Sequence, residues 1–386
     1  MAAVGARTSA VEAATAMKGG GYYSERTRGA KHVIDRAADM LLDAARSIPG
    51  PADDGQPLRI ADYGTADGGT SLDTICQTVA ALSERFPSRQ VEVVYTDLPS
   101  NDFSALFRNV ITGGDGADSE QPSMPGARLG SFPHVFVSAI GRGFHTQLLA
   151  DNSLDIGFSA TAMHYVSEKP CEISSHVHMV GAESEERAAF ARQAGEDWER
   201  ILLARAAELR AGGRLVICNF GIDEQGRYLG NTGGVNMFDT FDRLWRAEYD
   251  AGRITADEVR RATFAQAYRT REEFCAPLLD EDGPVFRAGL RLRRADMQLT
   301  PCPYRAAFDH ADGAMDARAF AQSYVPTLRS WSETVFLQAL DGARGADERA
   351  AIVDGFYRAY EDLVAADPEG HAMDYVHCYL EIEKTG

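Results

Sequence analysis

Residues 58–103 read LRIADYGTADGGTSLDTICQTVAALSERFPSRQVEVVYTDLPSNDF, and this stretch predicts a β-α-β unit. Two short apolar runs, 58–64 and 91–97, predict strands, and the periodic segment between them predicts a helix. In such a unit the strands are parallel and the connection is right-handed. Because ligands of parallel sheets bind at the carboxyl ends of the strands, we expect a binding site where Asp62 and Asp97 end their strands.

The same periodicities place further helices and strands on both sides of this unit. They predict helices over 33–42, 70–86 and 184–213, and strands over 134–140, 154–160, 214–221, 288–299 and 375–383. The long helix is expected to end at Gly212 and Gly213, because glycine is common just after the last turn of a helix. From about Asn231 the chain turns to helical stretches with large apolar residues, which predict an α-helical cap.

The expected fold class is α/β, with a seven-stranded Rossmann-like core and an α-helical cap, and with the last strand at or near an edge of the sheet. We expect the chain to divide into a tail (1–16), a core (17–230), a cap (231–286 and 302–366) and returning core strands (287–301 and 367–386). The turn formers and charges of residues 113–126 predict a mobile surface loop.

Composition and charge exclude several classes of partner. The 386 residues carry a net charge of −18, which repels nucleic acid, and the basic stretch RAGLRLRR (287–294) predicts a strand with one solvated face. No run approaches the roughly 18 apolar residues that a membrane span requires. The N-terminus also lacks the apolar core of a signal peptide, so we expect a soluble, cytoplasmic protein.

Cysteine and histidine spacing gives no sign of a metal site. The six cysteines lie far apart without a C-x-x-C pair, which argues against a zinc knuckle and a disulfide framework and predicts reduced, structural thiols. His176 and His178 are separated by one residue, but no matching carboxylate or cysteine accompanies them. We interpret them as solvated loop histidines and expect no metal.

The glycine turn after the first strand favours one nucleoside ligand over another. A nicotinamide dinucleotide favours G-x-G-x-x-G, but Ala66 stands at the second glycine. Asp67 near the helix start would repel a pyrophosphate and would tolerate the cationic amino-acid end of S-adenosylmethionine (SAM). Asp97 is placed to accept hydrogen bonds from ribose hydroxyls, which a nicotinamide cofactor would also exploit. A nicotinamide oxidoreductase and a βα turn without a ligand therefore stay open as alternatives.

A string of motifs resembles one methyltransferase family. TDLPSNDFSALF (96–107) resembles the D-L-P-x-N-D-F signature of the SABATH methyltransferases, small-molecule carboxyl and N-methyltransferases. Other family landmarks follow in order over roughly residues 17–225. They are MKGGG (17–21), IADYGTADG (60–68), GRGFHTQL (141–148, resembling P-G-S-F-Y), AMHYVSEKP (162–170, resembling L-H-W-L-S) and DWERILLARAAELRAGGRLVI (197–217).

The resemblance implies a SAM methyltransferase core and its cofactor residues. They are Tyr23, Thr27, Asp62, Gly64, Gly68, Thr70, Asp97, Leu98, Gly143 and Phe144. Phe144 is expected close to the adenine. Thr27 and Gly143 stand where the family has serines, and Thr70 stands where it has an asparagine.

The resemblance also implies where an acceptor binds. His164 and Tyr165 stand in place of the histidine and tryptophan that hold the acceptor carboxylate in the family. The family's carboxylate-binding glutamine falls on Ala30, so one donor is lost. Phe238 is expected to wall the pocket, and the family suggests a homodimer.

These residues predict methylation of the carboxylate of a small organic acid by in-line displacement. A carboxylate is already ionised at neutral pH, so no dedicated general base is required. No G-x-S-x-G elbow or phosphate loop supports a hydrolase or a nucleoside triphosphatase. An N-methyltransferase of a small heterocycle and a non-catalytic SAM-binding protein remain the alternatives.

Overall fold

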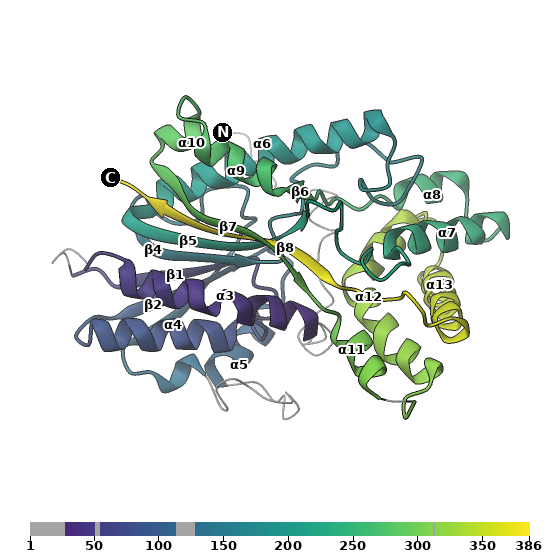
Figure 1. Cartoon of the computed structure of the whole chain (residues 1–386), viewed down its shortest axis with the longest axis horizontal. Helices are drawn as coiled ribbons and strands as arrows, with labels where there is room; N and C mark the ends of the chain where they lie inside the picture. Colours follow the sequence, from purple (N-terminus) through teal and green to yellow (C-terminus); the bar gives the residue numbers. More distant parts are fainter. Residues whose placement is uncertain (1–27, 51–54, 113–127, 312) are drawn as a thin grey trace.

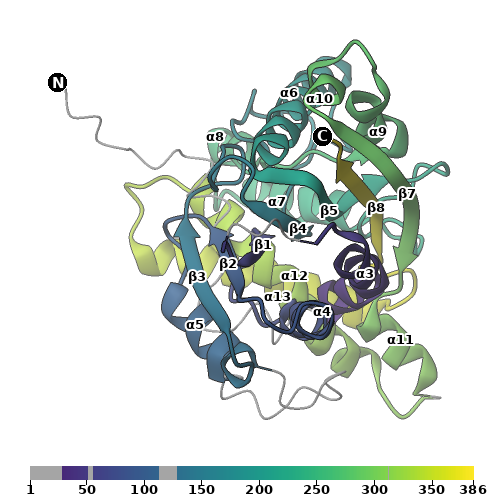
Figure 2. The same ribbon diagram turned by 90° about the vertical axis from the view of Figure 1, so that its left-hand side faces the viewer.

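The computed structural model describes residues 28–50, 55–112, 128–311 and 313–386. The expected tail, the MKGGG motif and the loop 113–126 lie outside the described residues. The described chain contains helices on both sides of a central sheet and a group of helices beyond one end of it (Figures 1 and 2).

The sheet confirms the predicted α/β class. Its strands are β1 (Leu58–Tyr63), β2 (Val91–Asp97), β3 (Val135–Gly141), β4 (Leu154–Ala160), β5 (Leu209–Ile222), β7 (Leu290–Thr300) and β8 (Tyr375–Lys384), in the order β3-β2-β1-β4-β5-β8-β7. The first five are parallel, and β8 and β7 are antiparallel to their neighbours. β8 therefore lies next to the edge strand β7. A short strand, β6 (Arg269–Thr270), pairs with the end of β5 and was not expected.

Helices cover both faces of the sheet because each buries one apolar side. On one face lie α3 (Arg28–Ser47), α4 (Leu72–Arg85) and α5 (Phe103–Thr112); on the other lie α6 (Ser184–Glu208), α9 (Arg271–Leu279) and α10 (Pro284–Arg287) (Figure 1). In α3, for example, Val33, Ala37 and Leu41 recur at helical spacing and are fully buried. The 3-10 helix η1 (Leu129–Ser131) precedes β3.

The remaining helices gather beyond the carboxyl ends of the parallel strands. They are α7 (Met237–Asp250), α8 (Ala256–Arg261), α11 (Pro303–His310), α12 (Ala317–Ala339) and α13 (Ala346–Ala366) (Figure 1). Phe241 contacts Phe336 and Phe356 at ring-centroid distances of 5.6 and 5.9 Å, so aromatic side chains form the core of this group. The division into core and cap stays a prediction, and within the expected cap segment α9 and α10 pack beside α6 and β7.

The expected end of the long helix at Gly212 and Gly213 is wrong. α6 ends at Glu208, and Leu209 already belongs to β5. Leu154 pairs with Leu209 but Ile156 pairs with Arg214, so the extra residues bulge out of the strand. Gly212 has a φ of 79° inside this bulge. The glycines therefore serve a β-bulge, which also favours glycine, and not a helix cap.

Three further observations concern membrane, thiol and metal chemistry. No helix of the described ranges is long and apolar enough to cross a membrane. The six cysteines, all of them described, are free, and five are buried. Across the described part of the chain, no group of three or more histidine, cysteine, aspartate or glutamate side chains could hold a metal ion.

Candidate functional site

The turn after β1 has a backbone shape that requires glycine. Gly64 and Gly68 have φ values of 75° and 71°. A Cβ atom on Gly64 would collide with the Ala162 side chain, and one on Gly68 would lie 2.8 Å from Cγ1 of Val110. The turn can therefore hold its backbone close to a ligand and to the neighbouring α5 at once.

Asp97 ties this turn to the end of β2. The backbone N–H of Ala66 donates to Oδ2 of Asp97 over 2.7 Å, and the N–H of Leu98 donates to Oδ1 over 2.7 Å. Ala66 itself has a φ of 52°, so the carboxylate supports a strained residue of the turn. Each oxygen keeps a second lone pair, which can accept from a hydroxyl of a ligand.

Asp62 is held by hydroxyl groups that the sequence interpretation missed. Ser71 donates to Oδ2 of Asp62 over 2.6 Å, and Thr65 donates to the same oxygen over 3.2 Å. The predicted residue Thr70 is buried beside Ser71, just before α4 begins at Leu72. Spacing alone does not show which of two adjacent hydroxyls turns toward the strand end.

Burial places both carboxylates in an unusual electrostatic state. It raises the pKa of Asp62 from 3.8 to about 6; the bonds from Ser71 and Thr65 lower it, and the charge of Asp97 raises it. Burial also raises the pKa of Asp97, against the two backbone hydrogen bonds. Two desolvated carboxylates in one site favour a cation and disfavour an anion.

These groups fit SAM and do not fit a dinucleotide. A pyrophosphate at the start of α4 would meet Asp67 and Asp73, and Lys31 already pairs with Asp73 over 3.1 Å. SAM carries a sulfonium and an ammonium and no phosphate. The two carboxylates, Asp62 and Asp97, and the glycine turn would hold its amino-acid and ribose portions.

The segment after β3 closes the other side of this turn. A Cβ atom on Gly64 would lie 3.8 Å from Cε1 of Phe144, and one on Gly143 would lie 3.6 Å from Cδ2 of Leu98. The structure thus brings Gly143 and Phe144 to the two loops that end β1 and β2. The described cofactor residues form one group, whereas Tyr23 and Thr27 lie outside the described residues.

His164 lies beyond the end of β4 in a ring of aromatic side chains. It is 2 % exposed, and its ring centroid lies 4.4 Å from Tyr165, 4.7 Å from Phe220 and 6.0 Å from Tyr268. Burial lowers the pKa of His164 to about 3; hydrogen bonding to Asn219 raises it, and the positive charge of Arg269 lowers it. The imidazole is therefore neutral at physiological pH.

Buried polar atoms without well-formed hydrogen bonds gather around His164. Within the described residues these include Nδ1 of His164, both amide atoms of Asn219 and Nδ1 of His377. Nε2 of His377 lies 3.2 Å from the Thr161 hydroxyl, and burial together with His164 holds the pKa of His377 well below its usual range. Unpaired buried polar groups are rare and call for a ligand or a water. Asn219 lies on β5, just past the motif 197–217, and His377 lies on β8, and neither has a local sequence pattern that marks it as a site residue.

The interpretation of His176 and His178 as solvated histidines is wrong. They are 7 % and 0 % exposed. The His178 ring stacks on Phe238 at 4.2 Å and lies 4.7 Å from Tyr268, so it forms a wall of the same aromatic region. Burial, then His176 and His164, holds the pKa of His178 well below its usual range. The burial of side chains in an irregular loop follows no sequence pattern, so the sequence could not predict it.

Phe238 and Ala30, the other predicted acceptor residues, lie around this aromatic region. Phe238 is fully buried and reaches it through His178. Ala30 is buried in the first turn of α3, and its neighbour Gly29 packs directly against the Tyr375 ring, which stacks on Phe220 at 5.8 Å. Ala30 offers no side-chain donor there.

Tyr165 is held through its main chain. Its carbonyl oxygen lies 3.1 Å from Nε2 of His145, and it forms a β-bridge with Gln266. His145 follows Phe144, so the cofactor and acceptor regions are joined at this point.

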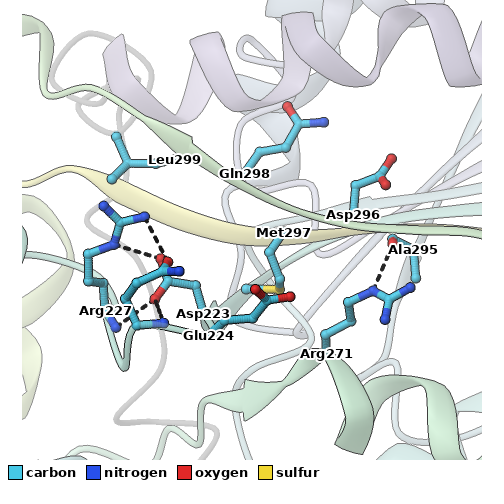
Figure 3. Close-up of a pocket in the computed structure, with 10 residues that line it drawn as sticks. Asp223, Glu224, Arg227, Arg271, Ala295, Asp296, Met297, Gln298 and Leu299 are labelled. Atoms are coloured by element: carbon cyan, nitrogen blue, oxygen red, sulfur yellow. Dashed lines mark hydrogen bonds and ion pairs between the residues drawn. The ribbon is translucent and has the colours of Figure 1, made fainter.

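A separate pocket of about 310 Å³ contains none of the predicted site residues. It lies between the loop after β5, the start of α9 and β7 (Figure 3). Arg227 pairs with Asp223 over 2.7 Å, and Arg271 donates to the carbonyl of Ala295 over 3.0 Å. Because Asp223, Arg227 and Arg271 pair within the protein and the pocket lies apart from both strand-end motifs, we assign it no part in the site.

Comparison with known proteins agrees with this geometry. The profile described as SAM dependent carboxyl methyltransferase matches residues 12–380. The chain belongs to this carboxyl methyltransferase family. The family resemblance read from the motifs is thereby confirmed.

Individual relatives extend the comparison. The chain is 28 % identical to methyltransferase LUC1 of Fusarium sp, over 55 % of this chain and 53 % of that protein. It is 29 % identical to loganic acid O-methyltransferase of Catharanthus roseus, over 52 % and 55 %. The chain spans about half the length of the curated relatives it matches.

A solved structure confirms the methyltransferase fold over nearly the whole chain. Loganic acid methyltransferase with S-adenosylhomocysteine (SAH) superposes with a TM-score of 0.71, at 20 % identity, over 96 % of this chain and 99 % of that chain. At this identity the likeness shows the fold.

Proposed function

We propose that this carboxyl methyltransferase family member transfers a methyl group from SAM to the carboxylate of a small organic acid. The observation that carries the proposal is the pairing of two regions at the carboxyl edge of the sheet. The buried Asp62 and the half-buried Asp97 form an anionic region that favours the cationic cofactor. Next to it, the neutral His164 lies in an aromatic region whose polar atoms lack well-formed hydrogen bonds, which suits an acceptor.

When bound, SAM supplies an electrophilic methyl group, and the residues of the chain orient the acceptor toward it. His164 can donate one N–H to an acceptor oxygen, because its neutral ring carries one proton. The Tyr165 hydroxyl is the second proposed donor. Holding two reacting groups in contact can lower a barrier by about 7–11 kcal/mol in favourable systems.

The neutrality of the donors has a mechanistic consequence. A cationic clamp would stabilise the ionised acid before reaction more than it stabilises the less charged transition state. Neutral imidazoles, hydroxyls and amides hold the carboxylate with weaker bonds, and the sulfonium balances its charge. No proton has to be removed from an ionised acid, so a general base is not needed.

An acceptor screen tests the proposal. The protein is incubated with methyl-labelled SAM and a panel that contains loganic, gibberellic and farnesoic acids together with purine and pyridine heterocycles. We expect label in a methyl ester, identified by mass spectrometry. Labelled N-methyl products would favour the heterocycle N-methyltransferase instead, which the neutral donor and acceptor atoms of Asn219 also suit.

Tight SAH binding without turnover of any acceptor would favour the non-catalytic alternative. Absence of SAH binding would contradict the proposal altogether. The homodimer and the cytoplasmic location expected from the sequence stay predictions.

A further inference from the structure

A buried charged network lies directly behind the cofactor region. Arg205 and Glu208, near the end of α6, are both fully buried and pair over 2.6 Å. Tyr63, which lies between Asp62 and Gly64 on β1, donates its hydroxyl to Oε2 of Glu208 over 2.5 Å. The Arg205 guanidinium also stacks over the Tyr63 ring at 4.2 Å. None of these three side chains was assigned a role from the motifs.

The backbone of a single loop supplies the other hydrogen-bond partners of Arg205 and Glu208. Glu208 accepts the backbone N–H groups of Leu148 and Leu149 over 2.5 and 3.2 Å. Arg205 donates to the carbonyl oxygens of Phe144 and Thr146, each over 2.9 Å. These hydrogen bonds join the ion pair to one short stretch of chain.

That stretch lacks secondary structure of its own. Residues 142–153 between β3 and β4 form neither helix nor strand, so their backbone has no ladder to hold it. Four hydrogen bonds to the side chains of Arg205 and Glu208 replace that ladder. The loop carries Gly143 and Phe144, which face Leu98 and Gly64.

A buried ion pair is poor evidence for a stability device, because desolvation offsets most of its attraction. Its value here is geometric. Tyr63 fixes the network to the end of β1, between Asp62 and Gly64, and Arg205 and Glu208 fix the Phe144 loop to the network. We propose that Tyr63, Arg205 and Glu208 are positioning residues that hold the Phe144 loop against the glycine turn and thereby set the affinity for the nucleoside of SAM.

This inference rests on the proposed function. Calorimetry of SAH binding tests the proposed function with the wild-type protein and the inference with variants. Tyr63→Phe removes one hydroxyl and keeps the ring, and we expect SAH to bind about tenfold more weakly, the usual effect of losing a buried hydrogen bond to a charged group. Tyr379→Phe is the matched control, because it also removes a buried hydroxyl, one that donates to the Val33 carbonyl over 3.1 Å on the far strand β8. SAH affinity of this control should not change.

A double-mutant cycle with Phe144→Ala distinguishes positioning from general stability. If Tyr63 acts through the loop, Tyr63→Phe should weaken SAH binding less than about twofold once the Phe144 ring is gone. An equal loss in both backgrounds would overturn the inference, as would unchanged SAH binding in Tyr63→Phe alone. Wild-type protein that gives no SAH isotherm would overturn the proposed function and this inference with it.

Hydrogen exchange of the wild-type protein gives a measurement that needs no variant. The amides of Leu148 and Leu149 lie in an irregular loop, yet we expect them to be protected like amides of β1, because Glu208 accepts both. Saturation of the protein with SAH should slow their exchange further. Exchange as fast as in an exposed loop would overturn the inference.

Discussion

Asp62 and Asp97 accept four hydrogen bonds from nearby groups of their own chain, whereas His164, Asn219 and His377 leave four buried atoms without well-formed ones. The cofactor region is therefore charged and held by the protein before a ligand binds. The acceptor region is neutral, and its polar atoms are left for a ligand to complete. The reaction that we propose joins a cationic methyl donor to an anionic acceptor. It would benefit from this asymmetry, because a fixed charge opposite the acceptor would stabilise the acid before reaction.

The first way to break this comparison is to remove the best-held carboxylate. Asp97→Ala leaves the N–H groups of Ala66 and Leu98 without acceptors and removes the proposed acceptor of the ribose hydroxyls. We expect SAH affinity to fall by about 100- to 1000-fold, or about 3–4 kcal/mol. Isothermal calorimetry measures it.

Asp155→Ala is the control for this variant. Asp155 is also buried and accepts the backbone N–H of Arg59 over 2.7 Å, but it lies at the opposite, amino end of the sheet. Its loss should leave SAH affinity within about twofold, as expected for independent sites. An Asp97→Ala protein that binds SAH as the wild type does would contradict the assignment of the cofactor region.

The second test removes the central imidazole of the acceptor region. His164→Ala should lower kcat/KM for the acid by about 30- to 100-fold, because a donor to a charged oxygen is lost. SAH affinity should stay unchanged, since His164 belongs to the other region. The buried His371, whose ring faces Tyr324 and Tyr360, gives the control variant His371→Ala. Full turnover in His164→Ala would disprove our acceptor assignment.

The third test uses pH to separate the two regions. The pKa of Asp62 is about 6, and the ammonium group of SAH prefers the ionised carboxylate, so SAH affinity should fall about tenfold between pH 7 and pH 5. In the ligand-free protein the sign is reversed. The raised pKa means that the folded state holds the proton more tightly than the unfolded chain, so this stabilising contribution is lost as pH rises from about 4 to 6.

Calorimetry of Asp62→Asn provides the comparison. Most of the pH dependence should disappear, and the remainder belongs to Asp97, whose pKa is also raised. His164, with a pKa of about 3, should add no change above pH 5. A pH profile identical in Asp62→Asn and wild type would assign the titration to another group.

The smallest effect is expected for a substitution of Asn219 in the acceptor region. Asn219→Leu replaces a buried amide that lacks well-formed hydrogen bonds by an apolar side chain of similar volume. We expect the KM of the acid to rise about three- to fivefold and the Tm to rise by about 1–3 °C, because a buried polar group without well-formed hydrogen bonds is removed. A lower Tm together with an unchanged KM would show that Asn219 serves the fold.

The cofactor region and the acceptor region also differ in how much of each could be predicted from the sequence. The glycine turn and Asp97 lie within one β-α-β unit, where local hydrogen bonds and sharp turns dictate the residue types, so short motifs reveal them. Phe144 and His164 were predicted as site residues only through resemblance to a family. Ser71, Asn219, His377 and the burial of His178 were missed, because nothing in their local spacing distinguishes them from ordinary helix, strand or loop residues.

The sequence by itself determined the parallel sheet, the strand ends and the acidic cofactor turn, because period-2 and helical patterns and glycine turns are local properties of the chain. Only the tertiary structure decided the acceptor region and the network behind Phe144. His164 after β4, Asn219 on β5 and His377 on β8 meet because β4 pairs with β5 and β5 pairs with β8, which come from separate parts of the sequence. Tyr63, Arg205 and Glu208 meet in the same way, and burial after assembly sets the charge state that each group carries.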